Sequence, residues 1–146
     1  MTSAAPDLRL SLVTLGVEDV ERAARFYEAL GMKRHMRKVE GVAFFDAGGV
    51  VFGLFGRADL AKDASVDDSK PGFSGVSLAF NVKDEPAVDA VIAAAAKLGG
   101  KILKEAQRAF WGGYHGYFSD LDGHIWEVAH NPGFGFDERG QIVLPE

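Results

Sequence analysis

Apolar and polar residues repeat one arrangement twice along the chain, over residues 11–55 and again over residues 76–129. Each copy opens with an apolar-rich segment whose last valine, Val17 or Val82, is followed two residues later by an aspartate. Aspartate is favoured at helix N-caps, and an apolar stripe at helical spacing follows in both copies. Later in each copy a glycine-containing turn separates two further apolar segments. The pattern predicts two tandem βαβββ units.

The two helices are the clearest predicted elements. Asp19 caps the first and Gly31 ends it, whereas Asp84 caps the second, which tolerates Pro86 in its first turn. The apolar stripes are Val20, Ala23, Ala24, Tyr27 and Leu30 in the first helix, and Val88, Val91, Ile92, Ala95 and Leu98 in the second. Both stripes indicate that each helix covers a sheet with one face.

The remaining elements follow from short apolar runs and turn residues. Strands are predicted over residues 8–17, 34–39, 42–46, 50–55, 76–82, 101–104, 114–119 and 124–130. One domain over residues 1–146 would hold a first repeat at 8–55, a linker at 56–72, a second repeat at 75–130 and a tail at 131–146. Within these, a helical turn is expected at 58–62, an irregular segment at 131–136 and a short edge strand at 141–144.

Composition narrows the class of protein. A chain of 146 residues can bury roughly two thirds of its unfolded surface, which is enough for one core. The formal charge of -5 and the lack of any Lys/Arg run argue against a nucleic-acid partner. There is no cysteine for a disulfide, a thiolate site or a nucleophile, and no apolar run of about twenty residues for a membrane span. We expect a soluble, cytoplasmic protein.

Three ordered segments carry a family resemblance: Val13–Asp19, Arg25–Gly31 and Tyr117–Val128. The second contains Phe-Tyr-x-x-x-Leu-Gly and the third Asp-x-Asp-Gly-x-x-x-Glu. Together they resemble the vicinal-oxygen-chelate superfamily, which includes glyoxalase I, extradiol dioxygenases and bleomycin- and fosfomycin-resistance proteins. The resemblance covers nearly the whole chain. It implies an α+β fold in which two βαβββ units form a curved mixed sheet around a central cavity, with helices on the convex side.

Strand alternation then predicts which residues face that cavity. Cavity-facing residues would be Leu12, Thr14 and Gly16 in the first strand, Ser77, Ala79 and Asn81 in the fifth, and Ile125, Glu127 and Ala129 in the last. Their neighbours Val13, Leu15 and Val17, then Val76, Leu78, Phe80 and Val82, then Trp126 and Val128, would face the helices. Thr14 and Asn81 would offer neutral hydrogen bonds to a ligand.

The resemblance also implies a metal centre at four equivalent points. These hold a His or Gln in the first strand of each unit and a Glu or His in each last strand, around a divalent ion that polarises substrate oxygens. In this sequence the four positions are Leu12, Gly53, Ser77 and Glu127. Only Glu127 has an ordinary metal-ligating side chain. We therefore expect no cofactor, with a divalent metal at a different site, using His115 or His130, as the alternative.

Glu127 is the candidate catalytic residue. A carboxyl group in a largely apolar cavity can contact a ligand or act as a general acid or base, or it can simply pair with a cation or a backbone amide. Antiparallel pairing about the turn at 120–123 puts either Gly116 or Tyr117 opposite Glu127. This register decides whether Tyr114 or His115 shares the face of Glu127, because a shift of one residue turns every side chain to the other face. We favour Tyr114, with His115 exposed. His124 is expected at the surface and His130 in a structural role.

An aromatic, glycine-containing loop precedes the seventh strand, at Phe110–Tyr114. Its glycines permit close approach, and Trp111 could stack on a planar ligand or simply cover the core. In the tail, Phe134 and Phe136 could close the same cavity or seal a dimer interface. These side chains suggest an apolar ligand site with a few polar groups.

Two classes of function remain. The first is a metal-independent protein that binds a small aromatic or amphipathic compound, as resistance proteins of this superfamily do. The second is a lyase, isomerase or dioxygenase-type enzyme that uses Glu127 as metal ligand or general base. A vestigial cavity in a dimerisation module is a third reading. The expected partners are a small molecule and a second copy of the chain, and the two repeats could pair within one chain or across that dimer.

Overall fold

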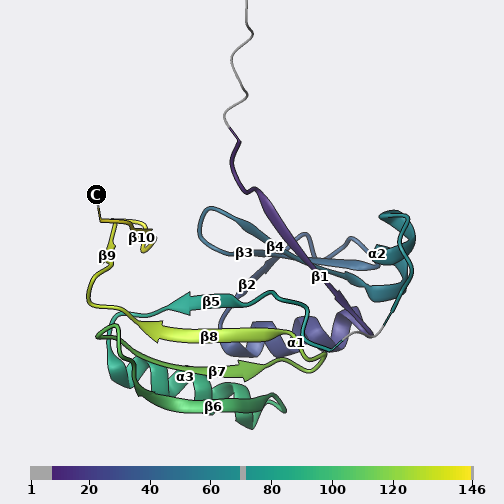
Figure 1. The fold of residues 1–146 in the computed structure, drawn as a ribbon. Helices are drawn as coiled ribbons and strands as arrows, with labels where there is room; N and C mark the ends of the chain where they lie inside the picture. Colours follow the sequence, from purple (N-terminus) through teal and green to yellow (C-terminus); the bar gives the residue numbers. More distant parts are fainter. Residues whose placement is uncertain (1–7, 70–71, 146) are drawn as a thin grey trace, which may run out of the picture.

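The computed structural model describes residues 8–69 and 72–145. Its first sheet has the order β1-β4-β3-β2, in which β1 runs parallel to β4 and the other neighbours are antiparallel. The strands are β1 (Leu12–Val17), β2 (Lys33–His35), β3 (Val42–Asp46) and β4 (Val51–Gly56). Helix α1 (Val20–Leu30) packs on β3 and β4, against one face of this sheet (Figure 1).

The second sheet repeats the arrangement in the order β5-β8-β7-β6, with β5 parallel to β8. Its strands are β5 (Leu78–Asn81), β6 (Lys101–Arg108), β7 (Tyr114–Ser119) and β8 (Ile125–His130). Helix α3 (Glu85–Lys97) covers β6, β7 and β8. The two predicted βαβββ units are confirmed, as curved sheets that do not close into a barrel.

Three shorter elements complete the chain. Helix α2 (Arg57–Asp63) follows β4, where a helical turn was predicted. After β8, β9 (Gly135–Phe136) and β10 (Ile142–Val143) form an antiparallel hairpin that joins neither sheet (Figure 1). The Gln141 side chain of this hairpin donates to the Gly48 carbonyl in the turn between β3 and β4. The prediction of an irregular segment over 131–136 is therefore wrong at its end, because Phe136 pairs with Ile142. None of the helices in the described part of the chain has the length and apolar character that a membrane crossing requires.

The helices begin and end where the sequence predicts. The Asp19 carboxylate accepts a hydrogen bond from the amide of Arg22 at 3.0 Å, and Asp84 accepts one from Ala87 at 2.9 Å. Gly31 has a φ of 112°, a left-handed conformation that glycine adopts without a steric penalty, and it ends α1. Local interactions therefore determine where both helices begin and where α1 ends.

Two strands, β2 and β6, end at other residues than the sequence pattern predicts. β2 stops at His35 instead of continuing to residue 39, because Met36 takes a φ of 55° and leaves the extended conformation. β6 runs to Arg108 rather than ending at 104, although its second half is polar. Pairing with β7 sustains it through two register shifts, at Ile102/Lys104 and Lys104/Gln107.

The two repeats meet through their helix-covered faces. Tyr27 of α1 is fully buried and its ring lies 5.8 Å from that of Trp126 on β8. Its hydroxyl donates to the Asp120 carboxylate and accepts from the Trp126 indole at 3.0 Å. Burial, with the Asp120 charge beside it, raises the pKa of Tyr27 above its ordinary value of 10.0. This network joins the repeats at the centre of the core.

The turn between β7 and β8 makes two further connections to the first repeat. The amide of Glu18 donates to the Asp122 carboxylate at 2.9 Å, and a His124 ring nitrogen lies 2.7 Å from the carbonyl oxygen of Gly16. Asp120 itself accepts the amides of Asp122 and His124. The expectation of a surface His124 is wrong, because this residue is half-buried against the first repeat. The Asp-x-Asp-Gly segment is thus a structural junction between the repeats.

Packing confirms the predicted strand faces. Leu15 and Val17 are buried on the α1 side of β1, and Phe80 stacks on Trp126 with ring centroids 4.3 Å apart. Val76 is an exception, because it is exposed and precedes the first residue of β5. Each sheet therefore has one face covered by α1 or α3, the helix-covered face. The opposite face, named the helix-free face, carries neither of these helices, and in the first sheet α2 contacts it at the end of β1, beside Gly16.

Candidate functional site

The register between β7 and β8 decides which residues share a face with Glu127. Tyr117 lies opposite Glu127, and His115 lies opposite Ala129. Residues directly opposite each other in an antiparallel pair point to the same side, as do residues two apart on one strand. Glu127, Tyr117 and His115 therefore lie together on the helix-free face of the second sheet.

The preference for Tyr114 on this face is wrong. Tyr114 pairs with His130, and its hydroxyl donates to the Asp89 carboxylate of α3 at 2.7 Å, on the helix-covered side. That hydrogen bond raises the pKa of Tyr114 above its ordinary value of 10.0. The physical reason lies in the turn, where the Asp120 carboxylate holds two backbone amides and so pairs Ser119 with Ile125.

His115 and Glu127 form a close pair. Nδ1 of His115 lies 2.6 Å from Oε2 of Glu127. His115 is 8% exposed, so its expected place as an exposed strand residue is also wrong, while the Glu127 side chain keeps 25% of its surface. An ionised carboxylate can only accept, so the imidazole Nδ1 donates in this pair. The site thus contains an imidazole whose orientation a carboxylate fixes.

Two aromatic rings flank the imidazole. The Trp111 ring lies edge-on to His115 at a centroid distance of 5.2 Å, and the Tyr117 ring lies at 5.6 Å. Burial, followed by the charge of Glu127 and a hydrogen bond to it, raises the pKa of Tyr117 above 10.0. Trp111 comes from the predicted aromatic loop and remains 38% exposed. Trp111 thus lies next to His115 on the surface, and its stacking on a ligand stays a prediction.

Gly113 allows Trp111 to reach this position. A Cβ added at Gly113 would lie 1.8 Å from the Trp111 ring, well inside van der Waals contact. The loop also turns back on itself, because the amide of Ala109 donates to the carbonyl of Gly113 at 2.8 Å. Because Gly113 has no side chain, the Trp111 indole can lie close to the sheet.

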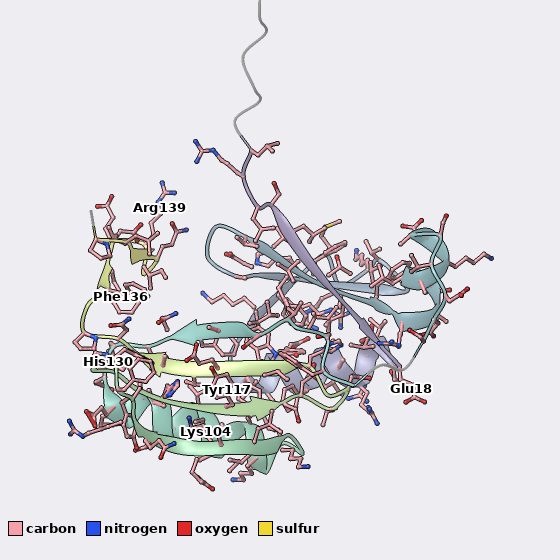
Figure 2. All side chains as sticks on the ribbon, viewed as in Figure 1. Glu18, Lys104, Tyr117, His130, Phe136 and Arg139 are labelled. Carbon is pink, nitrogen blue, oxygen red and sulfur yellow. The ribbon has the colours of Figure 1, made fainter. Side chains whose placement is uncertain are left out.

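Further polar residues extend across the same face. Lys104 of β6 pairs with Tyr117, and Gln107 pairs with His115. Figure 2 shows Tyr117 and Lys104 next to each other on the second sheet. Asn81, half-buried, lies opposite Ala129 on this face, as predicted. Sequence reasoning missed Lys104 as a member of this face, because the two irregularities in β6 fix its register. It left open whether Gly116 or Tyr117 lies opposite Glu127, and the structure selects Tyr117.

The first repeat presents a different helix-free face. Thr14 lies opposite Gly53, which in turn lies opposite Phe44. A Cβ added at Gly53 would lie 3.3 Å from Thr14 Oγ1, 3.5 Å from Leu12 and 3.6 Å from Phe44. The structure therefore brings Leu12, Thr14 and Gly53 together as predicted, on a different sheet from the pair formed by His115 and Glu127.

Three other predicted residues lie outside the group around His115. Ser77 is exposed just before β5, and its hydroxyl donates to the Leu78 carbonyl at 3.3 Å. Phe134 is half-buried between β8 and β9, with its amide bonded to the Asn131 carbonyl. The expectation of a structural role for His130 is confirmed, since its Nδ1 lies 3.2 Å from the Val82 carbonyl oxygen.

An apolar groove of about 520 Å³ lies beside the outer edge of β5. Three consecutive residues of that strand, Leu78, Ala79 and Phe80, line it together with Phe52 and Trp126. It lies at the junction of the two repeats, and none of His115, Tyr117 or Glu127 lines it. This groove is thus separate from the polar group on the helix-free face of the second sheet.

At the four positions that the family resemblance assigns to a metal centre, Glu127 alone has an ordinary metal-ligating side chain. Leucine and glycine supply no donor side chain, and the Ser77 hydroxyl is bonded to a backbone carbonyl. Glu127 is committed to His115. Over residues 8–69 and 72–145, no three His, Cys, Asp or Glu side chains lie close enough together to hold a metal.

Comparison with known proteins identifies the family. The model of the Glyoxalase/Bleomycin resistance protein/Dioxygenase superfamily matches residues 9–128. The chain belongs to this superfamily. A glyoxalase-related enzyme from Fulvimarina pelagi is 32% identical with a TM-score of 0.86, and the match covers 94% of this chain and 99% of that one.

More distant superfamily structures share the fold. A family enzyme from Burkholderia phytofirmans PsJN is 19% identical with a TM-score of 0.74, covering 84% of this chain and 98% of that one. A lactoylglutathione lyase from Agrobacterium tumefaciens is 22% identical with a TM-score of 0.67, covering 90% and 100%. These likenesses show the fold alone, so function has to be argued from the site.

Proposed function

We propose that this superfamily member binds a small aromatic or amphipathic molecule on the helix-free face of its second sheet, without the family's metal centre. The observation that carries the proposal is the pair of His115 and Glu127, with the rings of Trp111 and Tyr117 next to the imidazole. Small-molecule sites commonly combine apolar and aromatic walls with a few fixed polar groups, as this face does.

Fluorescence titration with a panel of planar aromatic compounds tests ligand binding. Trp126 is buried in the core, whereas Trp111 is exposed beside His115, so a bound ring should change mainly the Trp111 emission. We expect the change to disappear in Trp111→Ala while Trp126 keeps its emission. A panel that leaves emission unchanged in the wild type and shows no binding by calorimetry would contradict the proposal.

The metal-free state is supported by the donor chemistry at Leu12, Gly53 and Ser77. It is tested by metal analysis of protein purified without chelator, followed by thermal melts with nickel, zinc, manganese and iron. We expect no stoichiometric metal and no specific rise in Tm. Stoichiometric metal, with a rise in Tm that Glu127→Ala abolishes, would overturn this part of the proposal.

An enzyme is the second candidate, and the short His115–Glu127 contact favours it. A carboxylate-oriented imidazole is a common arrangement for proton transfer, and Glu127 could also serve as the base of a lyase or isomerase. Deuterium incorporation from D₂O into carbonyl compounds with acidic C–H bonds, followed by NMR, tests this. Exchange above background that Glu127→Ala and His115→Phe both abolish supports an enzyme, and equal exchange in all three proteins contradicts it.

We also propose a homodimer. β1 and β5 stand at the ends of their sheets, and neither has a strand on its outer side within the described part of the chain. Leu10, Leu12 and Val76 beside these edges are 69%, 46% and 56% exposed, and unpaired strand edges readily accept another chain. Sedimentation should give a dimer, and Val76→Lys with Leu12→Lys should shift it to monomer. A monomeric wild type at high concentration would contradict this.

A cytoplasmic location stays a prediction from the sequence.

A further inference from the structure

The His115–Glu127 contact fixes where the imidazole carries its proton. Oε2 of Glu127 lies 2.6 Å from Nδ1, and an ionised carboxylate has no proton to give. Nδ1 therefore holds the hydrogen and donates it. In the neutral ring the other nitrogen, Nε2, then has a lone pair and acts as a hydrogen-bond acceptor. The pairing thus gives this face a defined acceptor.

Nε2 of His115 is available to a ligand. Among residues 8–69 and 72–145, no hydrogen bond occupies it. The fully buried side-chain atoms without a partner in these residues are Nε of Arg34 and Oδ2 of Asp122, so Nε2 retains contact with the outside. Since 8% of His115 remains exposed, that contact is narrow.

The surroundings of the ring restrict the shape of a partner. The Trp111 ring lies at 77° to the imidazole with centroids 5.2 Å apart, and the Tyr117 ring lies at 65° to it with centroids 5.6 Å apart. Two aromatic rings thus lie next to the imidazole, and Lys104 lies opposite Tyr117 at the margin of the same face. Flat ligands gain most from contact with aromatic rings in such a setting.

We infer that this face selects a planar aromatic ligand that carries a hydroxyl or N–H group, which donates a hydrogen bond to Nε2 of His115. Glu127 is a positioning residue in this arrangement, because it holds the proton on Nδ1 and so leaves Nε2 as the acceptor. The inference rests on the proposed function, and it adds the hydrogen-bonding class of the ligand.

Three matched naphthalenes test the inference by calorimetry at neutral pH. 2-Naphthol carries the donor hydrogen, 2-methoxynaphthalene replaces that hydrogen by methyl, and 2-naphthoate offers only acceptors. We expect 2-naphthol to bind about tenfold more tightly than the methyl ether, the value of one hydrogen bond to a largely buried group. In His115→Phe, which keeps a ring but has no acceptor, the two should bind equally. Tyr114→Phe, altered on the opposite face of the same strand, should behave as the wild type.

The role of Glu127 has its own readout. In ¹⁵N-histidine-labelled protein, the two ring nitrogens of His115 give distinct resonances according to which one carries the proton. We expect the Nδ1–H form in the wild type, loss of that preference in Glu127→Ala, and loss of the tenfold advantage of 2-naphthol in the same variant. A wild-type His115 that holds its proton on Nε2 alone would overturn the inference, whatever the stability of the variant.

The possible outcomes separate the inference from the proposed function. Equal binding of 2-naphthol and its methyl ether, with Trp111 emission still changed, leaves the proposed function and overturns the inference. Tighter binding of 2-naphthoate that His115→Phe abolishes also overturns it, since His115 rather than Lys104 would then be the donor. If no planar aromatic compound binds at all, the proposed function fails, and the inference fails with it.

Discussion

The two repeats build the same fold and present different chemistry on their helix-free faces. In the first repeat, Gly53 lies among Leu12, Thr14 and Phe44, whose side chains are uncharged. At the corresponding place in the second repeat, Glu127 holds His115 beside two aromatic rings. The helix-covered faces, by contrast, share one core that runs through both repeats. Packing in the shared core constrains the residues on the helix-covered faces of both sheets. The residues on the helix-free faces are not under this constraint, and they differ between the repeats.

The largest expected effect concerns the junction that couples the repeats. Asp120 is 5% exposed and accepts hydrogen bonds from the Tyr27 hydroxyl and from two backbone amides. Asp120→Ala leaves these donors buried without a partner, and we expect it to lower the free energy of unfolding by about 3 kcal/mol in urea titrations.

Asp137 provides a matched control for that substitution. It accepts the amides two and four residues ahead, those of Arg139 and Gln141, as Asp120 accepts those of Asp122 and His124, but it is exposed and has no tyrosine partner. Asp137→Ala should cost less than about 1 kcal/mol. Equal losses for the two variants would show that the turn matters and the buried link between the repeats does not.

The next effect contrasts a helix-covered with a helix-free position. A Cβ at Gly116 would lie 2.5 Å from Ile92 of α3 and 2.8 Å from the Lys104 carbonyl oxygen, whereas one at Gly53 would have its nearest atom at 3.3 Å. We expect Gly116→Ala to destabilise the protein by about 2 kcal/mol and Gly53→Ala by less than half as much. Thermal melts of the two variants measure the difference, and the reverse order would contradict the assignment of faces.

A smaller effect should appear at high pH. Tyr27, Tyr114 and Tyr117 all have pKa values raised above 10.0, and they are the three tyrosines of the chain. Because the folded state holds each phenolic proton more tightly than the unfolded state, this stabilisation is complete below pH 10 and is lost as the pH rises further. Absorbance titration should show phenolate forming later in native than in urea-unfolded protein. Coincident titrations would contradict the described environments of all three tyrosines.

Much of the fold could be predicted because it is encoded locally. The caps at Asp19 and Asp84, the break at Gly31 and the alternation in β1 and β5 act over a few residues. The candidate site could be predicted only in part. Glu127 and Trp111 are visible in the sequence, but the register that selects His115 over Tyr114 depends on how Asp120 folds the turn against Tyr27, 93 positions away.

Two further features needed tertiary information. The irregular pairing of β6 places Lys104 opposite Tyr117, and alternation along β6 does not predict this. His124 follows a tight turn, a position typical of exposed residues, yet it contacts Gly16 because the turn packs against the end of β1. In both cases the deciding contact joins segments that periodicity treats separately.

The central claim is that the helix-free face of the second sheet, with His115 and not Tyr114 on it, is the ligand site. Calorimetric affinity for a planar aromatic ligand, measured in the wild type, His115→Phe and Tyr114→Phe, tests it most directly. We predict a loss of about tenfold in His115→Phe and an unchanged affinity in Tyr114→Phe. A loss in Tyr114→Phe with full affinity in His115→Phe would contradict the claim.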